Sequence, residues 1–192
     1  MVDQRLSWHS HIELLMNRTR ILIWTFKTLR HVSSEHLLRL TYISLAQSVL
    51  TYCITVWGGA NKTRFIDLER AQRSLLKVIY FKPREFPTDL LYSSANLLTV
   101  RKLYILHTVL SKHKSLPFKQ IINNARRKHN VVQQLRMRSV FAARQYVNRS
   151  NVLYNKVNKE LDIYSMKYKR CKAVLTEWLK TKTYAEIEMY IS

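Results

Sequence analysis

Glycine is nearly absent from this sequence of 192 residues, in which only Gly58 and Gly59 occur, next to each other. An average chain contains about 7% glycine, because many phosphate-binding loops and tight β turns need backbone angles that glycine adopts most easily. The sequence therefore excludes a glycine-rich phosphate loop and any fold with many tight β turns. Proline is also rare, with three residues, so we expect an all-α fold.

Cysteine is equally rare, because Cys53 and Cys171 are the two that occur, far apart and without the spacing of a metal site. Cys53 lies in an apolar stretch. We interpret both cysteines as reduced thiols in or near the core of an intracellular protein, nuclear or cytoplasmic. No motif for a cofactor occurs in the sequence.

Acidic residues are few, since 12 Asp and Glu stand against 33 Lys and Arg, which gives a net charge of +21. Repulsion at this level destabilises a compact state unless a polyanion neutralises it. Hydrophobic residues make up 47% of the chain, enough for a sizeable core. Nucleic acid is the expected partner, and the alternatives are an acidic protein partner or an anionic membrane surface.

The longest stretch without an acid extends from Leu90 to Lys159 and contains fourteen Lys or Arg with interspersed aromatic residues. This composition suits contact with a phosphate backbone, with some base stacking. The alternative is a solvated basic face whose aromatic neighbours belong to the core.

The pattern of carboxylates and histidines argues against catalysis by this chain. Asp67 and Glu69 are two residues apart and point to different sides of a helix, and Asp89 stands alone. No carboxylate pair has a spacing suited to two Mg²⁺ ions. His9 and His11 lack a third metal ligand. We expect no catalytic residues and no metal site.

Hydrophobic periodicity predicts helices and short connections along most of the chain. In the first helix, Ser10 and Glu13 fit a capping box. In the second, Ser33 or Ser34 begins the helix and Gly58-Gly59 ends it, and the predicted buried face is Leu38, Tyr42, Leu45, Val49, Tyr52 and Val56. The expected helices are 10–30, 34–57, 62–80, 89–95, 99–112, 118–128, 152–161 and 163–181, with a brief strand or extended arm within 130–148.

No charge occurs from Leu40 to Asn61, a length that could span a bilayer. Hydroxyl and amide side chains interrupt this run, so a core helix is favoured and no membrane span is expected. The segment "KSLPF" is the best candidate for a domain boundary. It divides the chain into a helical bundle, 1–115, and a less regular basic helical region, 116–192.

Five segments resemble a known family. They are "DQRLSWHSHI" (3–12), "LTYISLAQSVLTYCITVWGGA" (40–60), "LERAQRSLLKVIY" (68–80) and, more loosely, "NVLYNKVNKEL" with "KAVLTEWL". Together they look like the region after the palm of non-LTR (LINE-type, jockey-like) retrotransposon reverse transcriptases. The family motif that closes the palm and opens the thumb matches Asp3, Leu6, Trp8, His11 and Ile12, and later motifs match Tyr52, Trp57-Gly58 and Gln72-Arg73.

The resemblance implies a thumb-like antiparallel bundle that holds an RNA–DNA or DNA duplex by its backbone. In the family the fingers and the palm, with its catalytic aspartates, lie upstream of the matching point. RNA-directed DNA polymerase activity is therefore not expected of this chain alone, and a separately supplied palm domain is a further partner. The expected nucleic-acid contacts are Arg18, Arg20, Lys27, Arg30, Arg70, Arg73, Lys77, Arg101, Lys102, Arg126, Arg127 and Lys128.

Overall fold

The computed structural model of this chain describes residues 7–60, 62–116, 132–134, 137–139 and 145–191. Most of these residues are helical and none of them is in a strand, which confirms the predicted all-α class. The chain forms two compact units, unit 1 from Met1 to Leu103 and unit 2 from Tyr104 to Ser192. Their division lies inside helix α7 (Val100–Ser115), N-terminal to the boundary expected near residue 115. The expected helix at 118–128 lies outside the described residues.

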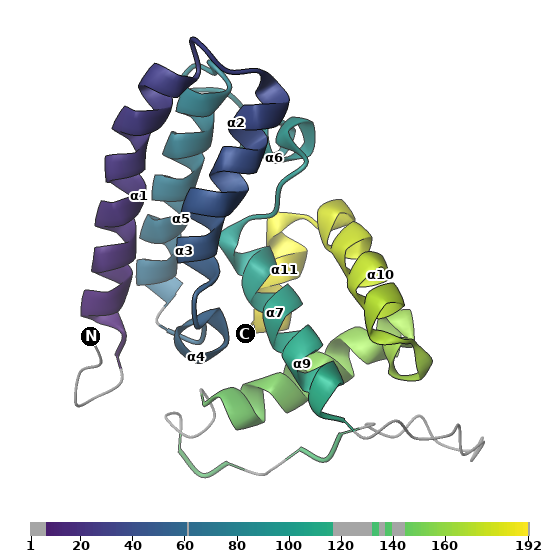
Figure 1. Ribbon diagram of the computed structural model, residues 1–192. Helices are drawn as coiled ribbons and strands as arrows, with labels where there is room; N and C mark the ends of the chain where they lie inside the picture. The colour runs from purple at the N-terminus through teal and green to yellow at the C-terminus, as the bar shows by residue number, and fades with distance from the viewer. Residues whose placement is uncertain (1–6, 61, 117–131, 135–136, 140–144, 192) are drawn as a thin grey trace. The chain divides into compact units, whose positions relative to one another are not determined.

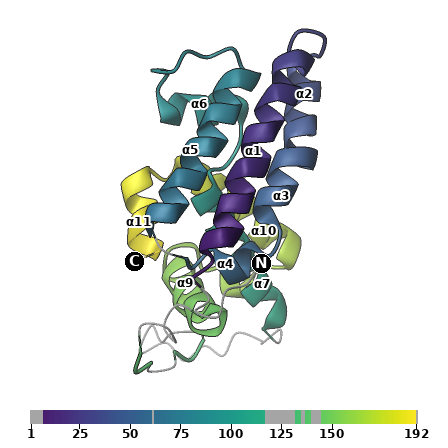
Figure 2. The same cartoon turned by 90° about the vertical axis from the view of Figure 1, so that its left-hand side faces the viewer.

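Unit 1 is a bundle in which three long helical segments lie side by side (Figures 1 and 2). The chain runs along α1 and returns through a second segment of four short helices before it reverses again into α5, along which α1 packs. A short helix, α6, follows α5. The bounds are α1 (His9–Leu29), α2 (Glu35–Thr41), the π-helix η1 (Tyr42–Gln47), α3 (Ser48–Thr51), α4 (Ile54–Trp57), α5 (Lys62–Ile79) and α6 (Thr88–Ala95).

A hydrophobic core joins α1, α2, η1, α5 and α6. Each of these helices contributes apolar side chains from one face, as the spacing of apolar residues predicts. The core residues are Phe26, Leu38, Tyr42, Ala46, Leu75, Leu76, Ile79, Leu91, Tyr92, Ala95 and Leu97.

Helix α1 begins earlier than the sequence predicted. Its N-cap is Trp8, which adopts a left-handed conformation and supplies no side-chain hydrogen bond, while Ser10 and Glu13 lie inside the helix. The predicted capping box is therefore wrong. Packing explains the early start, because Ile12 is fully buried and the His11 ring lies 5.6 Å from the ring of Trp57.

The second helical segment buries a different face from the one predicted. Ser34 caps its start and accepts a hydrogen bond from the Leu37 amide, but the segment then widens into η1, in which a turn takes more than four residues. The buried positions consequently follow one another at intervals of four and then three. They are Leu38, Tyr42, Ala46, Leu50, Ile54 and Trp57, whereas Leu45, Tyr52 and Val56 of the predicted face are exposed.

This segment also breaks one turn before the glycine pair. Tyr52 leaves the helical conformation and Cys53 is left-handed, with φ of 50°. The indole Nε1–H of Trp57 donates to the freed carbonyl of Tyr52 at 2.8 Å. Helix α4 then ends at Trp57, with Gly58 as its C-cap, so the end that we predicted at the glycines is confirmed and the break before it was missed.

Gln72 of α5 is a fully buried polar centre in unit 1. Its amide donates to the hydroxyl of Tyr42 at 2.9 Å and to the carbonyl of Leu98 at 3.1 Å. Its carbonyl oxygen accepts from the hydroxyl of Tyr92 at 2.8 Å and from the amide of Val100 at 3.0 Å. All four hydrogen-bonding positions of this side chain are filled, which ties η1, α6 and the start of α7 to α5.

Within its described residues, unit 2 contains the rest of α7 and four later helical elements. They are α9 (Tyr146–Leu161), the 3₁₀ turn η2 (Ile163–Ser165), α10 (Tyr168–Thr181) and α11 (Tyr184–Ile191). Helix α9 begins before the expected helix at 152, α10 ends where it was expected, and α11 was not predicted. The described parts of 130–148 contain no strand. No helix of the described residues is long and apolar enough to cross a membrane.

Polar side chains link separate segments of unit 2. The side chain of Asn155 exchanges two hydrogen bonds with the backbone of Val132, at 3.0 and 2.7 Å. The ring of His113 bonds through Nδ1 to the hydroxyl of Tyr154 and through Nε2 to the carbonyl of Met166, both at 2.9 Å. Because a carbonyl can only accept, Nε2 carries a ring proton, and in the neutral ring Nδ1 accepts from Tyr154.

Candidate nucleic-acid interface

The outer face of α1 carries an exposed apolar ridge. Leu14, Ile21 and Trp24 follow one another at spacings of seven and three, which places them on one side of the helix. They lie opposite the face that packs in the bundle, and Trp24 is 75% exposed. A tryptophan left in water on a surface helix is available to a partner.

Basic side chains lie along both edges of this ridge. Arg20 and Lys27, seven residues apart, share one edge, and the helical period of 100° per residue places Arg18 on the other. All three are exposed, and none forms a hydrogen bond or ion pair with another described residue. No acid occurs between Glu13 and Glu35. The face, which we call the α1 ridge (Leu14, Arg18, Arg20, Ile21, Trp24 and Lys27), is therefore cationic at its edges and apolar at its centre.

Arg30, also expected to contact nucleic acid, is instead part of the fold. Its guanidinium donates to the carbonyl of Val78 at 2.9 Å and lies 4.2 Å from the ring centre of Phe81. These contacts hold the end of α1 against the end of α5, so we leave Arg30 out of the α1 ridge.

Arg101 is the least exposed of the expected contacts that the structure describes. It is 3% exposed, and its guanidinium Nε lies 3.1 Å from Oε1 of Glu69. Burial raises the pKa of Glu69, although the nearby Arg101 acts in the opposite direction. The position of Arg101 does not support a phosphate contact, because a buried arginine with a carboxylate partner is held inside the protein.

The remaining expected contacts of unit 1 are partly engaged. Arg70 is exposed and pairs with Asp67 at 3.0 Å. Arg73 donates to the hydroxyl of Thr88 at 3.1 Å, and Lys77 donates to the carbonyl of Arg84. Lys102 is half-buried. Within unit 1, the unengaged cations among the expected contacts are thus those of α1.

Three expected contacts, Arg126, Arg127 and Lys128, lie outside the described residues. Their proposed role continues to rest on the sequence alone. The structure also shows a group of exposed basic residues that we did not include among the expected contacts. Lys167, Lys169, Arg170 and Lys172 are exposed at the start of α10.

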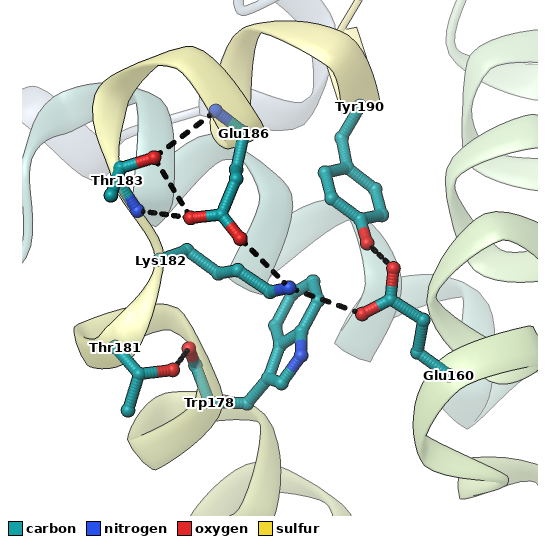
Figure 3. Close-up of polar contacts among 7 residues, drawn as sticks. All are labelled: Glu160, Trp178, Thr181, Lys182, Thr183, Glu186 and Tyr190. Carbon is teal, nitrogen blue, oxygen red and sulfur yellow. Dashed lines mark hydrogen bonds and ion pairs between the residues drawn. The ribbon is translucent and has the colours of Figure 1, made fainter.

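Acids neutralise Lys182 at the other end of α10 (Figure 3). The ammonium of Lys182 lies 3.3 Å from both Glu160 and Glu186, above the ring of Trp178. Tyr190 donates its hydroxyl to Glu160. Hydrogen bonds from the backbone and side chain of Thr183 lower the pKa of Glu186 to about 2, which keeps it ionised beside Lys182.

No group of three or more His, Cys, Asp or Glu within the described parts of the chain could hold a metal ion. Comparison of the chain with protein-family models, with curated proteins and with solved structures finds no match in any of the three. The arguments for function therefore come from the residues and their geometry.

Proposed function

We propose that this chain binds nucleic acid through its phosphate backbone, and that the α1 ridge is a contact surface. The role is that of the reverse-transcriptase thumb that the sequence resembles. The observation that carries the proposal is the pairing of an exposed apolar centre with two cationic edges on one helix of a strongly basic chain.

The dimensions of the ridge suit a groove. Arg18 and Lys27 are nine residues apart, roughly 14 Å along the helix axis, which is about four base-pair steps of a duplex. With cations on both edges, the helix can reach phosphates of both strands while Trp24 and Ile21 face the groove. The wide, shallow minor groove of A-form geometry accepts such a face more readily than the narrow minor groove of B-form DNA. An RNA–DNA hybrid is therefore the favoured ligand.

The test is the salt dependence of duplex binding by the full chain, measured by fluorescence anisotropy. In the triple variant Arg18→Gln, Arg20→Gln, Lys27→Gln, the log–log slope should become shallower by about three units if each cation neutralises one phosphate. The matched control is Arg64→Gln, Lys82→Gln, Arg84→Gln, which removes the same charge from exposed positions elsewhere in unit 1.

A slope that changes equally in both triple variants would show that only net charge matters and would remove the α1 ridge from the proposal. Trp24→Ala separates the centre from the edges. It should weaken binding to all duplexes while leaving the slope unchanged, because no phosphate contact is lost. If the α1 triple variant lost binding to anionic vesicles but kept its binding to duplexes, the partner would instead be a membrane surface.

A further inference from the structure

Four cations gather at the start of α10 without acidic partners. Lys167, Lys169, Arg170 and Lys172 are exposed, and their side chains form no hydrogen bond or ion pair with other described residues. Farther along the same helix, Lys180 lies 2.7 Å from Glu177, and Lys182 lies between two carboxylates. Cations at the C-terminal end of α10 thus have acidic partners, whereas those at its start have none among the described residues.

This distribution is opposite to the one that stabilises a helix. The start of a helix carries partial positive charge and favours acids, yet α10 has no acid in its first turn and its cap residue Lys167 supplies no side-chain acceptor. Two like-charged pairs, Lys167 with Arg170 and Lys169 with Lys172, stand three residues apart and repel each other. Helix α11, by contrast, places Glu186 in its first turn, bonded to Thr183. The cations at the start of α10 therefore destabilise this helix unless an anion neutralises them.

We propose that the start of α10 is a second binding site, in unit 2, for the phosphodiester backbone of nucleic acid, with Lys169, Arg170 and Lys172 as its contacts. Lys167 contributes charge at the cap. Four cations within six residues match the close spacing of phosphates along one strand. Tyr168, 46% exposed, offers a ring on which an unpaired base can stack. The inference rests on the nucleic-acid binding proposed above and adds a surface to it.

A phosphate-bearing membrane is disfavoured as the occupant by the composition of this surface. Helices that lie on membranes bury several large apolar side chains between their cations. Here Tyr168 is the one large apolar side chain exposed among the four cations, and Cys171 between them is buried. The geometry therefore favours a ligand that contacts charge along a line rather than one that accepts an apolar face.

The test compares two triple variants of the full chain. Lys169→Gln, Arg170→Gln, Lys172→Gln removes the site, and Arg64→Gln, Lys82→Gln, Arg84→Gln removes the same charge from exposed positions outside it. Binding to a short duplex and to a short single strand is measured as a function of salt. The first variant should flatten the salt slope by about three units and the control by less.

The same variant has a second, independent readout. Without nucleic acid, removal of repelling charges from the start of α10 should raise the melting temperature, whereas nucleic acid should stabilise the wild type more than the variant. Opposite signs for stability and affinity are not expected of a residue that only supports the fold. Equal salt slopes in the site variant and its control would overturn the inference.

The outcomes separate this site from the α1 ridge. If the α1 triple variant binds normally and the α10 variant does not, the α1 ridge is eliminated and the α10 site stands; the reverse result eliminates the α10 site alone. Normal duplex binding by the α10 variant, with loss of binding to polyglutamate or to vesicles containing phosphatidylserine, would also overturn it in favour of an acidic protein or a membrane.

Discussion

Units 1 and 2 place their polar groups differently. Unit 1 buries a charged residue, Arg101, together with the amide of Gln72, whereas the buried polar side chains described in unit 2 are all neutral. Unit 2 nevertheless has the larger excess of basic residues, 18 Lys or Arg against 5 Asp or Glu, compared with 15 against 7 in unit 1.

The scarcity of acids explains the difference. A cation can be buried only beside a compensating partner, and unit 1 provides Glu69 for that purpose. Unit 2 has no acid before Glu160, so most of its cations have no carboxylate against which to fold. A lack of acids therefore leaves cations at the surface, where an anionic ligand can reach them.

The largest expected effect comes from breaking the buried pair of unit 1. Arg101→Met should lower the free energy of unfolding by about 3 kcal/mol, because Glu69 is left half-buried without its partner. Arg70→Met, which breaks the exposed pair with Asp67, should cost less than about 1 kcal/mol. Denaturant unfolding measures both. Equal costs for the two variants would contradict the structural role given to Arg101.

A smaller effect is expected from the neutral contacts of unit 2. Tyr154→Phe removes the hydroxyl that the His113 ring accepts from, and should cost about 1 kcal/mol. The control is Tyr168→Phe, whose ring is exposed. Denaturant unfolding of the two variants, followed by circular dichroism, gives the comparison. If Tyr154→Phe were as stable as wild type, the hydrogen bond from Tyr154 to His113 would not contribute to unit 2.

The fold class and most helix positions could be predicted from the sequence, because composition and apolar spacing act locally. Caps were less predictable, because Ser10 and Glu13 have the spacing of a capping box but do not form one, whereas Thr183 and Glu186 do. A Ser or Thr with this spacing forms a capping box only where it is the N-cap of the helix. Helix α1 begins before Ser10, because the residues around Ile12 are packed in the bundle.

The prediction of the buried face of the second helical segment was wrong for a related reason. A regular helix period selects Leu45 and Val49, but the wider turn of η1 brings Ala46 and Leu50 to the core. The sequence could have suggested this alternative, because Leu38, Tyr42, Ala46, Leu50 and Ile54 repeat every four residues. Nothing in the local sequence distinguishes the two registers without the neighbouring helices.

The sequence could not predict which of the expected contacts are exposed, because tertiary structure decides exposure. Arg101 and Arg18 are both arginines on helices, but Arg101 is buried in an ion pair and Arg18 is exposed. This difference depends on the helices packed around each residue, which the local sequence does not give. The acid-free composition predicts an anionic partner. It gave no means of telling which cations lie outside.

The smallest expected effect tests unit 2 through pH. Burial, followed by the charge of Lys172, lowers the pKa of His107 from its ordinary value of 6.5. Between the lowered folded pKa and 6.5 the unfolded chain binds more protons than the folded chain, so stability is complete above this window and falls as the pH drops through it. His107→Gln should flatten that fall. An anion bound at the start of α10 should raise the pKa of His107 by offsetting Lys172, which NMR titration of the His107 ring with and without a short single strand can measure. A pKa that does not move when the strand binds would place the bound phosphates away from Lys172.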